Sequence, residues 1–331
     1  MRELRFAIIG YGKTGKIRYE TLSAMAGCRV VRICEPDPQA IFPTSIPNTC
    51  QVGDVFRDRE VDAVIVCTPN HFIKNYVIQG LRHGKHVFAE KPPGRNMMEL
   101  QAMIDEEKQN LDLKLMFGFN HRHHESMLHT KKLIDSGEYG RILWLRGRYG
   151  KSVSADFFSS WRSQKDLAGG GIFLDQGIHM LDLFLMFCGD FDEVQAMVSN
   201  LYWKLDIEDN VFAIFRNQQG QVASLHSTMT QWRHIFSLEI FLELGYITIN
   251  GLKTSSNTYG EEAMTIVKNR SLPPAAVWTQ QEDITFPTDY SWQKEMAVFV
   301  ESIRAKEAVP VGNTQDAFKL MRIVEKIYAQ K

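Results

Sequence analysis

Apolar residues follow two different patterns along this chain, and the change between them falls near residue 120. In the first part, short continuous apolar runs are separated by helical patterns, as in parallel strands that helices cover on both faces. This alternation is typical of a doubly wound parallel sheet. The runs predict strands over 4–9, 30–34, 63–67, 86–89 and 113–119, and the later intervals predict helices over 72–83 and 96–109.

The connection after the second strand departs from this alternation. Pro43 and Pro47, together with Thr44, Ser45 and Asn48, leave no room for a full helix. We therefore expect a short or irregular connection there.

Beyond residue 120, strands follow one another without helices between them. Apolar Phe236, Leu238 and Ile240 alternate with polar Ser237 and Glu239, the period of a strand with one buried face. The order predicts a large, mostly antiparallel, open-faced sheet backed by helices. The predicted strands cover 142–149, 193–201, 211–216, 222–229, 236–242 and 246–250, the helices cover 125–136, 291–304 and 314–329, and 251–274 is expected to be a loop with one short strand near 264–267.

A glycine-rich turn follows the first predicted strand. Residues 10–15 match G-x-G-x-x-G between a strand and a helix, and Glu35 follows 20 residues after Gly15. The glycines let a pyrophosphate reach the helix N-terminus, and an acidic side chain at this spacing accepts the ribose hydroxyls of NAD. A tight turn without a ligand is the alternative, which the spacing disfavours. The expected cofactor contacts here are Gly10, Gly12, Lys13, Thr14, Gly15 and Glu35.

The residues after Glu35 bear on the choice of dinucleotide. They read Pro-Asp-Pro-Gln and offer no cation for a 2′-phosphate. NAD is therefore favoured over NADP.

Two more motifs follow strands of the first half. In open α/β sheets, ligands bind at the carboxyl ends of the strands, so both motifs are expected beside the cofactor. An exposed lysine at a strand end is the alternative interpretation of Lys91. The first motif is Thr68, Pro69, Asn70 and His71, and the second is Glu90, Lys91 and Pro92.

Residues 169–182 combine three glycines with an apolar helical pattern. Asp175 and His179 stand four apart, on one face of the predicted helix, and form a candidate proton-handling pair. For an isolated pair, a buried core histidine would be the better interpretation. Upstream, Trp161 and Arg162 suit either stacking on a sugar face and gripping an anion or a structural pair at a loop edge.

The order and separation of these motifs resemble the Gfo/Idh/MocA oxidoreductases over nearly the whole chain. The resemblance implies that Lys91 lies between nicotinamide and substrate and that the Lys91–Pro92 peptide is cis. It also implies that Asn120, Arg122, Trp161 and Arg162 line the substrate cleft. Asp182 recurs in the family motif and suits a structural role as well as a ligand contact. The chain departs from the family pattern at Ile73, where many members carry a second histidine that makes a peripheral contact.

The same resemblance suggests the domain organisation. It implies a Rossmann dinucleotide-binding domain over 1–120, an α+β substrate and oligomerisation domain over 121–312, and a C-terminal helix over 313–331 that packs back on the first domain. The open sheet face commonly forms the subunit interface in this family. We therefore expect a homodimer or homotetramer.

Histidines cluster at 121–124 and at His129. No cysteine or carboxylate set at zinc spacing accompanies them, and hydride transfer with a Lys/His/Asp site needs no metal. We expect a solvated helix start here and no metal site.

Composition narrows the classes of protein to consider. The chain is 44% apolar with a formal net charge of −1, which offers no field for nucleic acid or a membrane surface. Its five cysteines are dispersed without a C-x-x-C pair, and the charged N-terminus lacks the apolar run of a signal peptide. A cytoplasmic protein is expected.

Together these features predict an NAD-dependent oxidation of a secondary alcohol on a sugar-like ring. Lys91 and His179 are both candidates for the proton acceptor, and Asp175 would orient the substrate or the histidine. A nucleotide-linked or phosphorylated sugar is favoured because Arg122 and Arg162 suit an anionic tail. The alternatives are a free polyol or inositol, or a non-catalytic NAD-binding regulatory or assembly protein.

Overall fold

The structure, a computed structural model, describes residues 2–37, 39–40, 42–43, 45–268 and 277–330. Residues 38, 41 and 44 near the expected irregular connection, and 269–274 of the expected loop, lie outside the described residues. Contacts divide the chain into two compact units. Unit 1 comprises Met1–Asn120, Asp166–Gly169 and Trp292–Met321, and unit 2 comprises His121–Lys165, Gly170–Ser291 and Arg322–Lys331.

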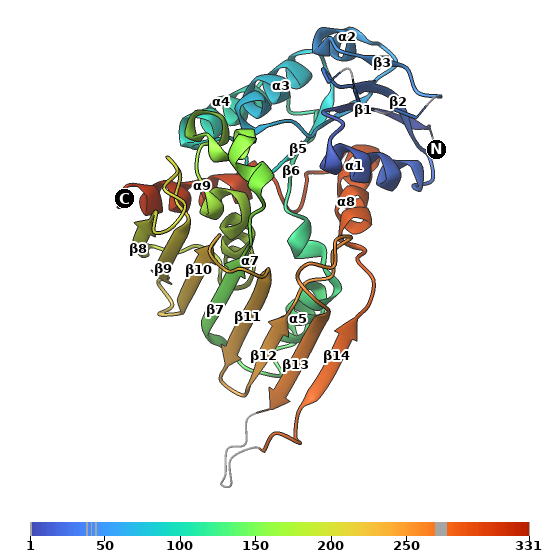
Figure 1. The fold of residues 1–331 in the computed structure, drawn as a ribbon. Helices are drawn as coiled ribbons and strands as arrows, with labels where there is room; N and C mark the ends of the chain where they lie inside the picture. Colours follow the sequence, from blue (N-terminus) through green and yellow to red (C-terminus); the bar gives the residue numbers. More distant parts are fainter. Residues whose placement is uncertain (1, 38, 41, 44, 269–276, 331) are drawn as a thin grey trace. The chain divides into compact units, whose positions relative to one another are not determined.

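Unit 1 is built on a six-stranded parallel sheet in the order β3-β2-β1-β4-β5-β6 (Figure 1). This confirms the predicted doubly wound sheet. The strand order reverses between β1 and β4, and open sheets of this kind bind ligands in the crevice at that point. The strands are β1 (Leu4–Ile9), β2 (Cys28–Cys34), β3 (Asn48–Thr49), β4 (Ala63–Val66), β5 (His86–Glu90) and β6 (Leu115–Gly118), and the helices are α1 (Lys13–Ser23), α2 (Val52–Arg57), α3 (Asn70–Arg82) and α4 (Met97–Glu107).

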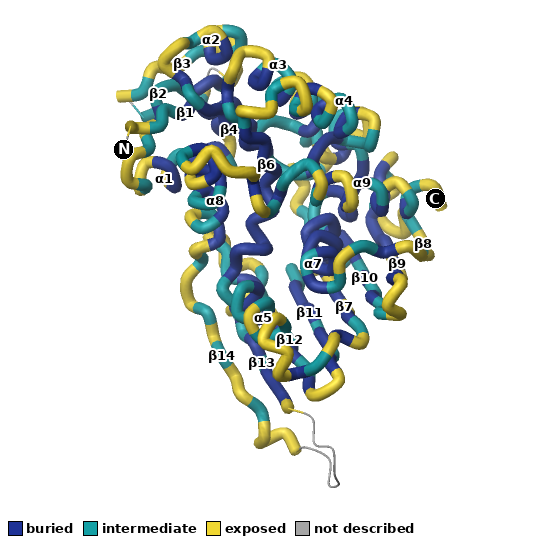
Figure 2. Tube along the Cα trace, turned by 180° about the vertical axis from the view of Figure 1, so that it is seen from behind, coloured by how far each residue is buried: buried dark blue, intermediate teal, exposed yellow. Residues whose placement is uncertain are grey.

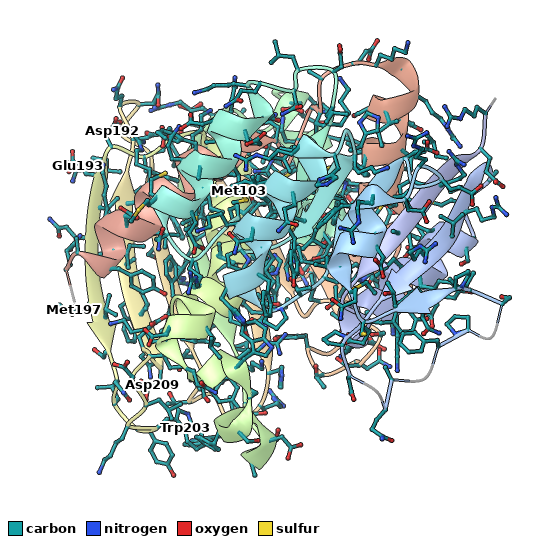
Figure 3. The ribbon with its side chains drawn as sticks, turned by 90° about the horizontal axis from the view of Figure 1, so that it is seen from above. Met103, Asp192, Glu193, Met197, Trp203 and Asp209 are labelled. Carbon is teal, nitrogen blue, oxygen red and sulfur yellow. The ribbon has the colours of Figure 1, made fainter. Side chains whose placement is uncertain are left out.

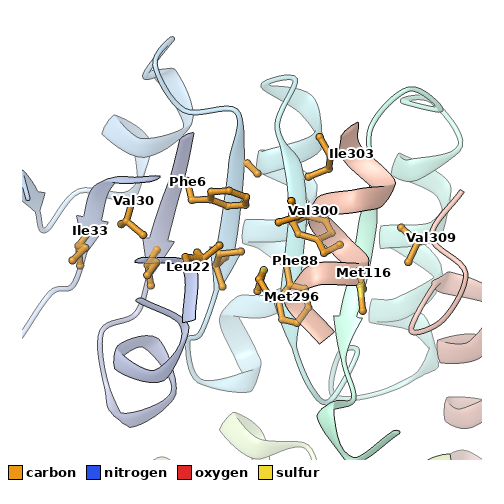
Figure 4. Packing of buried hydrophobic residues seen from close by; sticks show 14 of the residues in the cluster. Phe6, Leu22, Val30, Ile33, Phe88, Met116, Met296, Val300, Ile303 and Val309 are labelled. Carbon is orange, nitrogen blue, oxygen red and sulfur yellow. The ribbon is translucent and has the colours of Figure 1, made fainter. Parts of the chain in front are cut away.

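Helix α8 (Ser291–Ala305) supplies part of the core of unit 1. Met296 and Val300 from this helix pack in one buried cluster with Phe6 and Phe88 from the sheet (Figure 4). Such apolar contacts are the main favourable term in folding. The helical pattern at 291–304 therefore belongs to the compact unit formed around the parallel sheet.

Unit 2 contains an eight-stranded sheet in the order β14-β13-β12-β11-β7-β10-β9-β8. All of its pairs are antiparallel except β7 with β10. The predicted strands are all present, and the edge strand β14 was not predicted. The strands are β7 (Ile142–Gly150), β8 (Glu193–Ser199), β9 (Asn210–Arg216), β10 (Val222–Thr228), β11 (Ile235–Leu242), β12 (Gly245–Asn250), β13 (Glu262–Lys268) and β14 (Glu282–Phe286).

The directions of these strands bring several loops to one edge of the sheet. β10 runs parallel to β7 and antiparallel to β9, and β9 runs antiparallel to β8. β7, β8 and β10 therefore all end at the same edge. The loops that gather there are 151–154, 200–209 and 229–234.

Helix α7 (Ile178–Cys188) is buried on nearly every side, as its dark blue tube shows (Figure 2). Gly147 in β7 makes its close packing possible, because an added Cβ would lie 2.5 Å from Met180. Among the described residues, one stretch, Lys165–Cys188, is apolar and long enough to cross a membrane, but 72% of its most apolar window is buried in the fold. The remaining helices are α5 (Glu125–Asp135), α6 (Lys165–Ala168) and α9 (Thr314–Tyr328).

Candidate active site

The glycine turn of unit 1 has the shape that a dinucleotide requires. Gly10 has φ +90°, and a Cβ on Gly15 would lie 2.1 Å from the Gly10 carbonyl oxygen, so both positions exclude a side chain. A Cβ on Gly12, by contrast, would meet nothing within 4 Å. Lys13 and Thr14 begin α1, whose first turn carries no acidic side chain. The turn therefore leaves space at Gly12 and an uncompensated helix N-terminus for an anion.

Glu35 lies at the end of β2, where its carboxylate closes over this turn. Its Oε2 accepts the Tyr11 backbone N–H at 2.6 Å, and its Oε1 accepts the Asp37 N–H at 3.1 Å. A carboxylate fixed in this way keeps lone pairs for ribose hydroxyls. The sequence predicts a contact between Glu35 and the ribose, but it does not predict the hydrogen bond between Glu35 and the glycine turn.

The segment after β4 begins α3. Pro69 precedes the helix, Asn70 is buried and donates from Nδ2 to the Ala168 carbonyl oxygen at 2.7 Å, and Thr68 lies beside the turn at Gly10. Burial lowers the pKa of the His71 imidazole. The motif thus joins three segments of unit 1 at the carboxyl edge of its sheet.

Glu90 is the last residue of β5, Lys91 follows it directly, and Glu90 belongs to a buried ion-pair network. Arg18 of α1 is fully buried, donates from Nε to Glu90 Oε1 at 2.8 Å and reaches Glu295 of α8 at 2.5 Å. Burial raises the pKa of Glu295 to about 7. The network fixes the strand end from which Lys91 emerges. The predicted cis peptide at Lys91–Pro92 is confirmed.

Asp175 lies in a small pocket of unit 2 among cations. Lys151 Nζ approaches Asp175 Oδ2 at 3.4 Å, and Arg162 Nε approaches Oδ1 at 3.8 Å. Met229 and Phe157 also line this pocket. Arg162 also lies over the Trp161 ring at 4.5 Å, so the Trp/Arg pair and Asp175 come together. Lys151 was missed by the sequence prediction.

The turn that carries Asp175 differs from the expected regular helix. Phe173–Gly177 forms a π-helical turn, and α7 begins after it. At Gly177 an added Cβ would fall 2.7 Å from Ser227 Oγ, so this wide turn packs directly on β10. Single π-helical turns of this kind occur frequently at functional sites.

His179 is buried in the first turn of α7 and stacks on His121. The two ring centroids lie 3.8 Å apart with planes 14° apart, and His121 Nε2 lies 2.9 Å from Tyr149 Oη. The expected solvated helix start at 121–124 is therefore wrong, because His121, His123 and His124 are buried. His124 donates to Glu262, which holds the pKa of that carboxyl below its usual value although burial alone would raise it.

A buried glutamate, Glu208, anchors the glycine turn before Asp175. Its carboxylate accepts the Gly171 N–H at 2.8 Å, the Phe173 N–H at 3.1 Å and the Tyr328 hydroxyl at 2.8 Å. Burial raises the pKa of Glu208. The sequence prediction missed this residue because the contact joins positions 37 apart.

Arg122 and Asp182 form a buried bidentate pair. Arg122 Nε and Nη2 donate to the two Asp182 carboxylate oxygens at 2.7 and 2.6 Å. Asn120 is also buried, at the end of unit 1. Arg122 is thus engaged by a carboxylate of its own unit, and its expected contact with substrate stays a prediction.

Comparison with known proteins finds two matching family models. One, described as "Oxidoreductase family, NAD-binding Rossmann fold", matches residues 4–119, and the other, "GFO/IDH/MocA C-terminal domain", matches residues 127–248. The levoglucosan dehydrogenase of Pseudarthrobacter phenanthrenivorans is 30% identical over 268 residues, which cover 69% of this chain and 68% of that protein.

Two further similarities cover more of the chain. The myo-inositol 2-dehydrogenase of Thermotoga maritima is 23% identical over 333 residues, which cover 88% of this chain and 96% of that protein. A solved structure of a levoglucosan dehydrogenase in complex with NADH has a TM-score of 0.86 at 24% identity and covers 99% of this chain and 97% of that chain.

Proposed function

The chain belongs to the Gfo/Idh/MocA family of oxidoreductases, and we propose that it is an NAD-dependent dehydrogenase that oxidises a secondary alcohol of a sugar-like ring. The observation that carries this proposal is the Asp175 pocket. A carboxylate flanked by Lys151 and Arg162 stands four residues before a buried histidine, on a turn that Glu208 anchors. The names of the relatives support the choice of a sugar or polyol as substrate.

The residues of unit 1 fit NAD. Gly12 leaves room for the pyrophosphate, Glu35 can accept the ribose hydroxyls, and the motifs at Thr68–His71 and Glu90–Pro92 follow β4 and β5 at the ligand-binding edge of the sheet. When bound, the dinucleotide supplies the hydride acceptor. The protein's own task is then to orient the alcohol and to remove its proton.

His179 or Lys91 is proposed to take that proton. A neutral imidazole accepts a proton near neutral pH, and an ammonium can stabilise a developing alkoxide by donating to it. Asp175 is proposed to orient the substrate through a hydroxyl group. Lys91 and His179 are thus the two candidates for the proton acceptor.

The substrate class is proposed from the charges around Asp175. Lys151 and Arg162 give this pocket a surplus of positive charge, which favours a phosphorylated or nucleotide-linked sugar. A free polyol or inositol is the second candidate. It is favoured because Lys151 and Arg162 both pair with Asp175, which leaves less positive charge for an anionic substrate.

We also propose that the open face of the unit 2 sheet joins two copies of the chain. Met197 is 75% exposed and Ile214 is 55% exposed on β8 and β9, beside the half-exposed Phe212. Clustered apolar side chains at a surface are typical of protein interfaces. Sedimentation of a Met197→Glu/Ile214→Glu variant should show a smaller species than the wild type. A reducing, cytoplasmic location is proposed on the five free cysteines.

A turnover screen tests the proposed activity. Sugars, polyols, sugar phosphates and nucleotide sugars are offered to the enzyme with NAD, and NADH formation is followed by absorbance. For the best substrate, His179→Ala and Lys91→Ala should each lose roughly 10²- to 10⁴-fold in kcat, as for positioned acid/base groups. Exposed His83→Ala and Lys319→Ala are the matched controls. Near-full turnover in both active-site variants would refute the assignment.

A further inference from the structure

An exposed aromatic cluster lies at the loop edge of the unit 2 sheet. Tyr202 is 57% exposed and Trp232 is 62% exposed, and their ring centroids lie 5.0 Å apart. Trp203 lies 4.8 Å from Tyr202 and 5.8 Å from Trp232, and Phe158 lies 5.1 Å from Trp203. We call Phe158, Tyr202, Trp203 and Trp232 the aromatic platform.

The platform is fixed by hydrogen bonds to its backbone. Asp209 accepts the N–H groups of Leu201, Tyr202 and Trp203 at 2.8, 2.7 and 3.0 Å (Figure 3 shows Asp209 and Trp203). Burial alone would raise the pKa of Asp209, but these amides hold it below its usual value. Trp203 Nε1 donates to the Met229 carbonyl oxygen at 2.9 Å. The rings of Tyr202 and Trp203 are therefore presented by a loop that these hydrogen bonds hold.

Two platform loops contain backbone conformations that bulky residues rarely adopt. Trp232 has φ +58°, and Lys204, directly after Trp203, has φ +53°. Side chains other than glycine avoid this region, and exceptions gather at ligand-binding and catalytic sites. Trp232, the most exposed residue of the platform, has such a conformation.

The platform begins where the Asp175 pocket ends. Met229 lines that pocket and is the residue to which Trp203 donates. Phe157 also lines the pocket, and its neighbour Phe158 packs on Trp203. The loops after β7, β8 and β10 place these residues together at one edge of the sheet. A molecule held at Asp175 can therefore extend over the platform within the same unit.

We propose that the platform stacks the ring of a second glycosyl unit joined to the ring that is oxidised, so that the substrate class is a glycoside or short oligosaccharide. This inference rests on the proposed dehydrogenase function, and it replaces the phosphorylated or nucleotide-linked sugar of that proposal with a glycoside. A pyranose offers an apolar C–H face to one aromatic ring and polar edges to its surroundings. The rings of Tyr202, Trp203 and Trp232 meet at 70–85°, and Phe158 meets Trp203 at 51°. These rings therefore provide single faces and edges rather than the parallel pair that sandwiches a flat nucleobase.

Paired substrates test the platform by kinetics. Wild-type enzyme, Trp232→Ala and Trp232→Phe are assayed with glucose, cellobiose, maltose and UDP-glucose, and Trp278→Ala, which removes an 86% exposed ring outside the platform, is the control. We expect Trp232→Ala to lose about tenfold in kcat/KM for a disaccharide, the size of one aromatic stacking contact. Glucose turnover should stay within about twofold, Trp232→Phe should retain most of the disaccharide activity, and Trp278→Ala should match the wild type.

A binding measurement separates this inference from the proposed function. Cellobiose and maltose are titrated into the NADH-loaded wild type and Trp232→Ala by calorimetry. Weaker disaccharide binding to the variant supports the platform even when no sugar in the panel is oxidised. Equal losses for glucose and disaccharides, an effect confined to UDP-glucose, or a change in sedimentation caused by Trp232→Ala would each overturn the glycosyl assignment.

Discussion

Each unit contains a glycine turn that leads into a helix, and in each unit a carboxylate accepts backbone N–H groups of the turn. In unit 1, Glu35 accepts from Tyr11 at 2.6 Å. In unit 2, Glu208 accepts from Gly171 and Phe173 at 2.8 and 3.1 Å. The local chemistry is the same, but the space around the turns is different.

The unit 1 turn is open at Gly12, and the unit 2 turn is filled at Gly171. A Cβ on Gly12 would meet nothing within 4 Å, whereas a Cβ on Gly171 would lie 2.1 Å from the Glu208 carbonyl oxygen. Glu35 is partly exposed, and Glu208 is 1% exposed. The first turn therefore leaves space for a ligand, and the second is occupied by the protein itself and holds the segment that carries Asp175 and His179.

Alanine at the two turns should give the largest contrast. Gly171→Ala forces a methyl group against a backbone carbonyl and should lower the free energy of unfolding by at least about 3 kcal/mol, or prevent folding. Gly12→Ala should change that free energy by no more than about 1 kcal/mol, because φ −68° suits alanine. Urea unfolding monitored by circular dichroism measures both. Equal stability of the two variants would contradict the comparison.

Gly12→Ala should instead impair the cofactor site. A methyl group at this position obstructs the approach of a pyrophosphate to the backbone, so NADH should bind about tenfold more weakly or worse. Isothermal titration calorimetry on the folded variant measures this. The wild type serves as the reference. No other glycine is used as a control, because a Cβ on Gly53 would meet Arg57, and exposed Gly84 and Gly220 have positive φ angles that alanine rarely adopts.

Glu208→Gln should give the next largest effect. The amide keeps the shape but loses charge-assisted acceptance of two backbone N–H groups and the Tyr328 hydroxyl. We expect a loss of about 2 kcal/mol in the free energy of unfolding and a fall in kcat larger than any change in KM. Tyr328→Phe removes one of these bonds and should cost about 1 kcal/mol. Unchanged kcat in Glu208→Gln would show that the anchor does not position the site.

The same residue predicts a pH dependence. Because burial raises the pKa of Glu208 in the folded protein, protonation favours folding, and this contribution is fully present below the unfolded-state value of about 4.3. This contribution to the free energy of unfolding is lost as the pH rises through the raised pKa of Glu208 in the folded protein. The stability of wild type relative to Glu208→Gln should therefore decline as pH increases from about 4 towards neutrality. A difference that is flat with pH would contradict the raised pKa.

The two turns also show what the sequence could predict. The unit 1 turn follows β1 and Glu35 follows β2, and these two strands are neighbours in the sheet. The number of residues between them along the chain therefore predicts that they lie close together in the fold. Glu208 and Lys151 reach the second site from positions 37 and 24 residues away, through the register of a sheet that periodicity does not reveal. Asp175 and His179 were found because they are local neighbours.

The partners of buried charged side chains and the edge strand of the unit 2 sheet were harder to predict from the sequence. Arg122 looked available for an anion, but a carboxylate 60 residues away binds it bidentately. The histidines at 121–124 looked solvated because their burial partners, such as Tyr149 and Glu262, belong to later strands. Strand β14 (Glu282–Phe286) is an edge strand with exposed residues, so it lacks the apolar run by which the central strands were recognised.

Glu35→Gln should give the smallest effect and would sharpen the comparison most. If Glu35 serves a ligand as well as the turn, the variant should keep the wild-type free energy of unfolding within about 0.5 kcal/mol. Its NADH dissociation constant should rise about tenfold, as expected for the loss of one charge-assisted hydrogen bond. NADPH should be affected less, because its 2′-phosphate does not gain from a carboxylate. Calorimetric titrations with both cofactors measure the ratio. A large loss of stability with unchanged NADH affinity would make Glu35 a structural anchor like Glu208, and the distinction between an open and a filled turn would then rest on Gly12 alone.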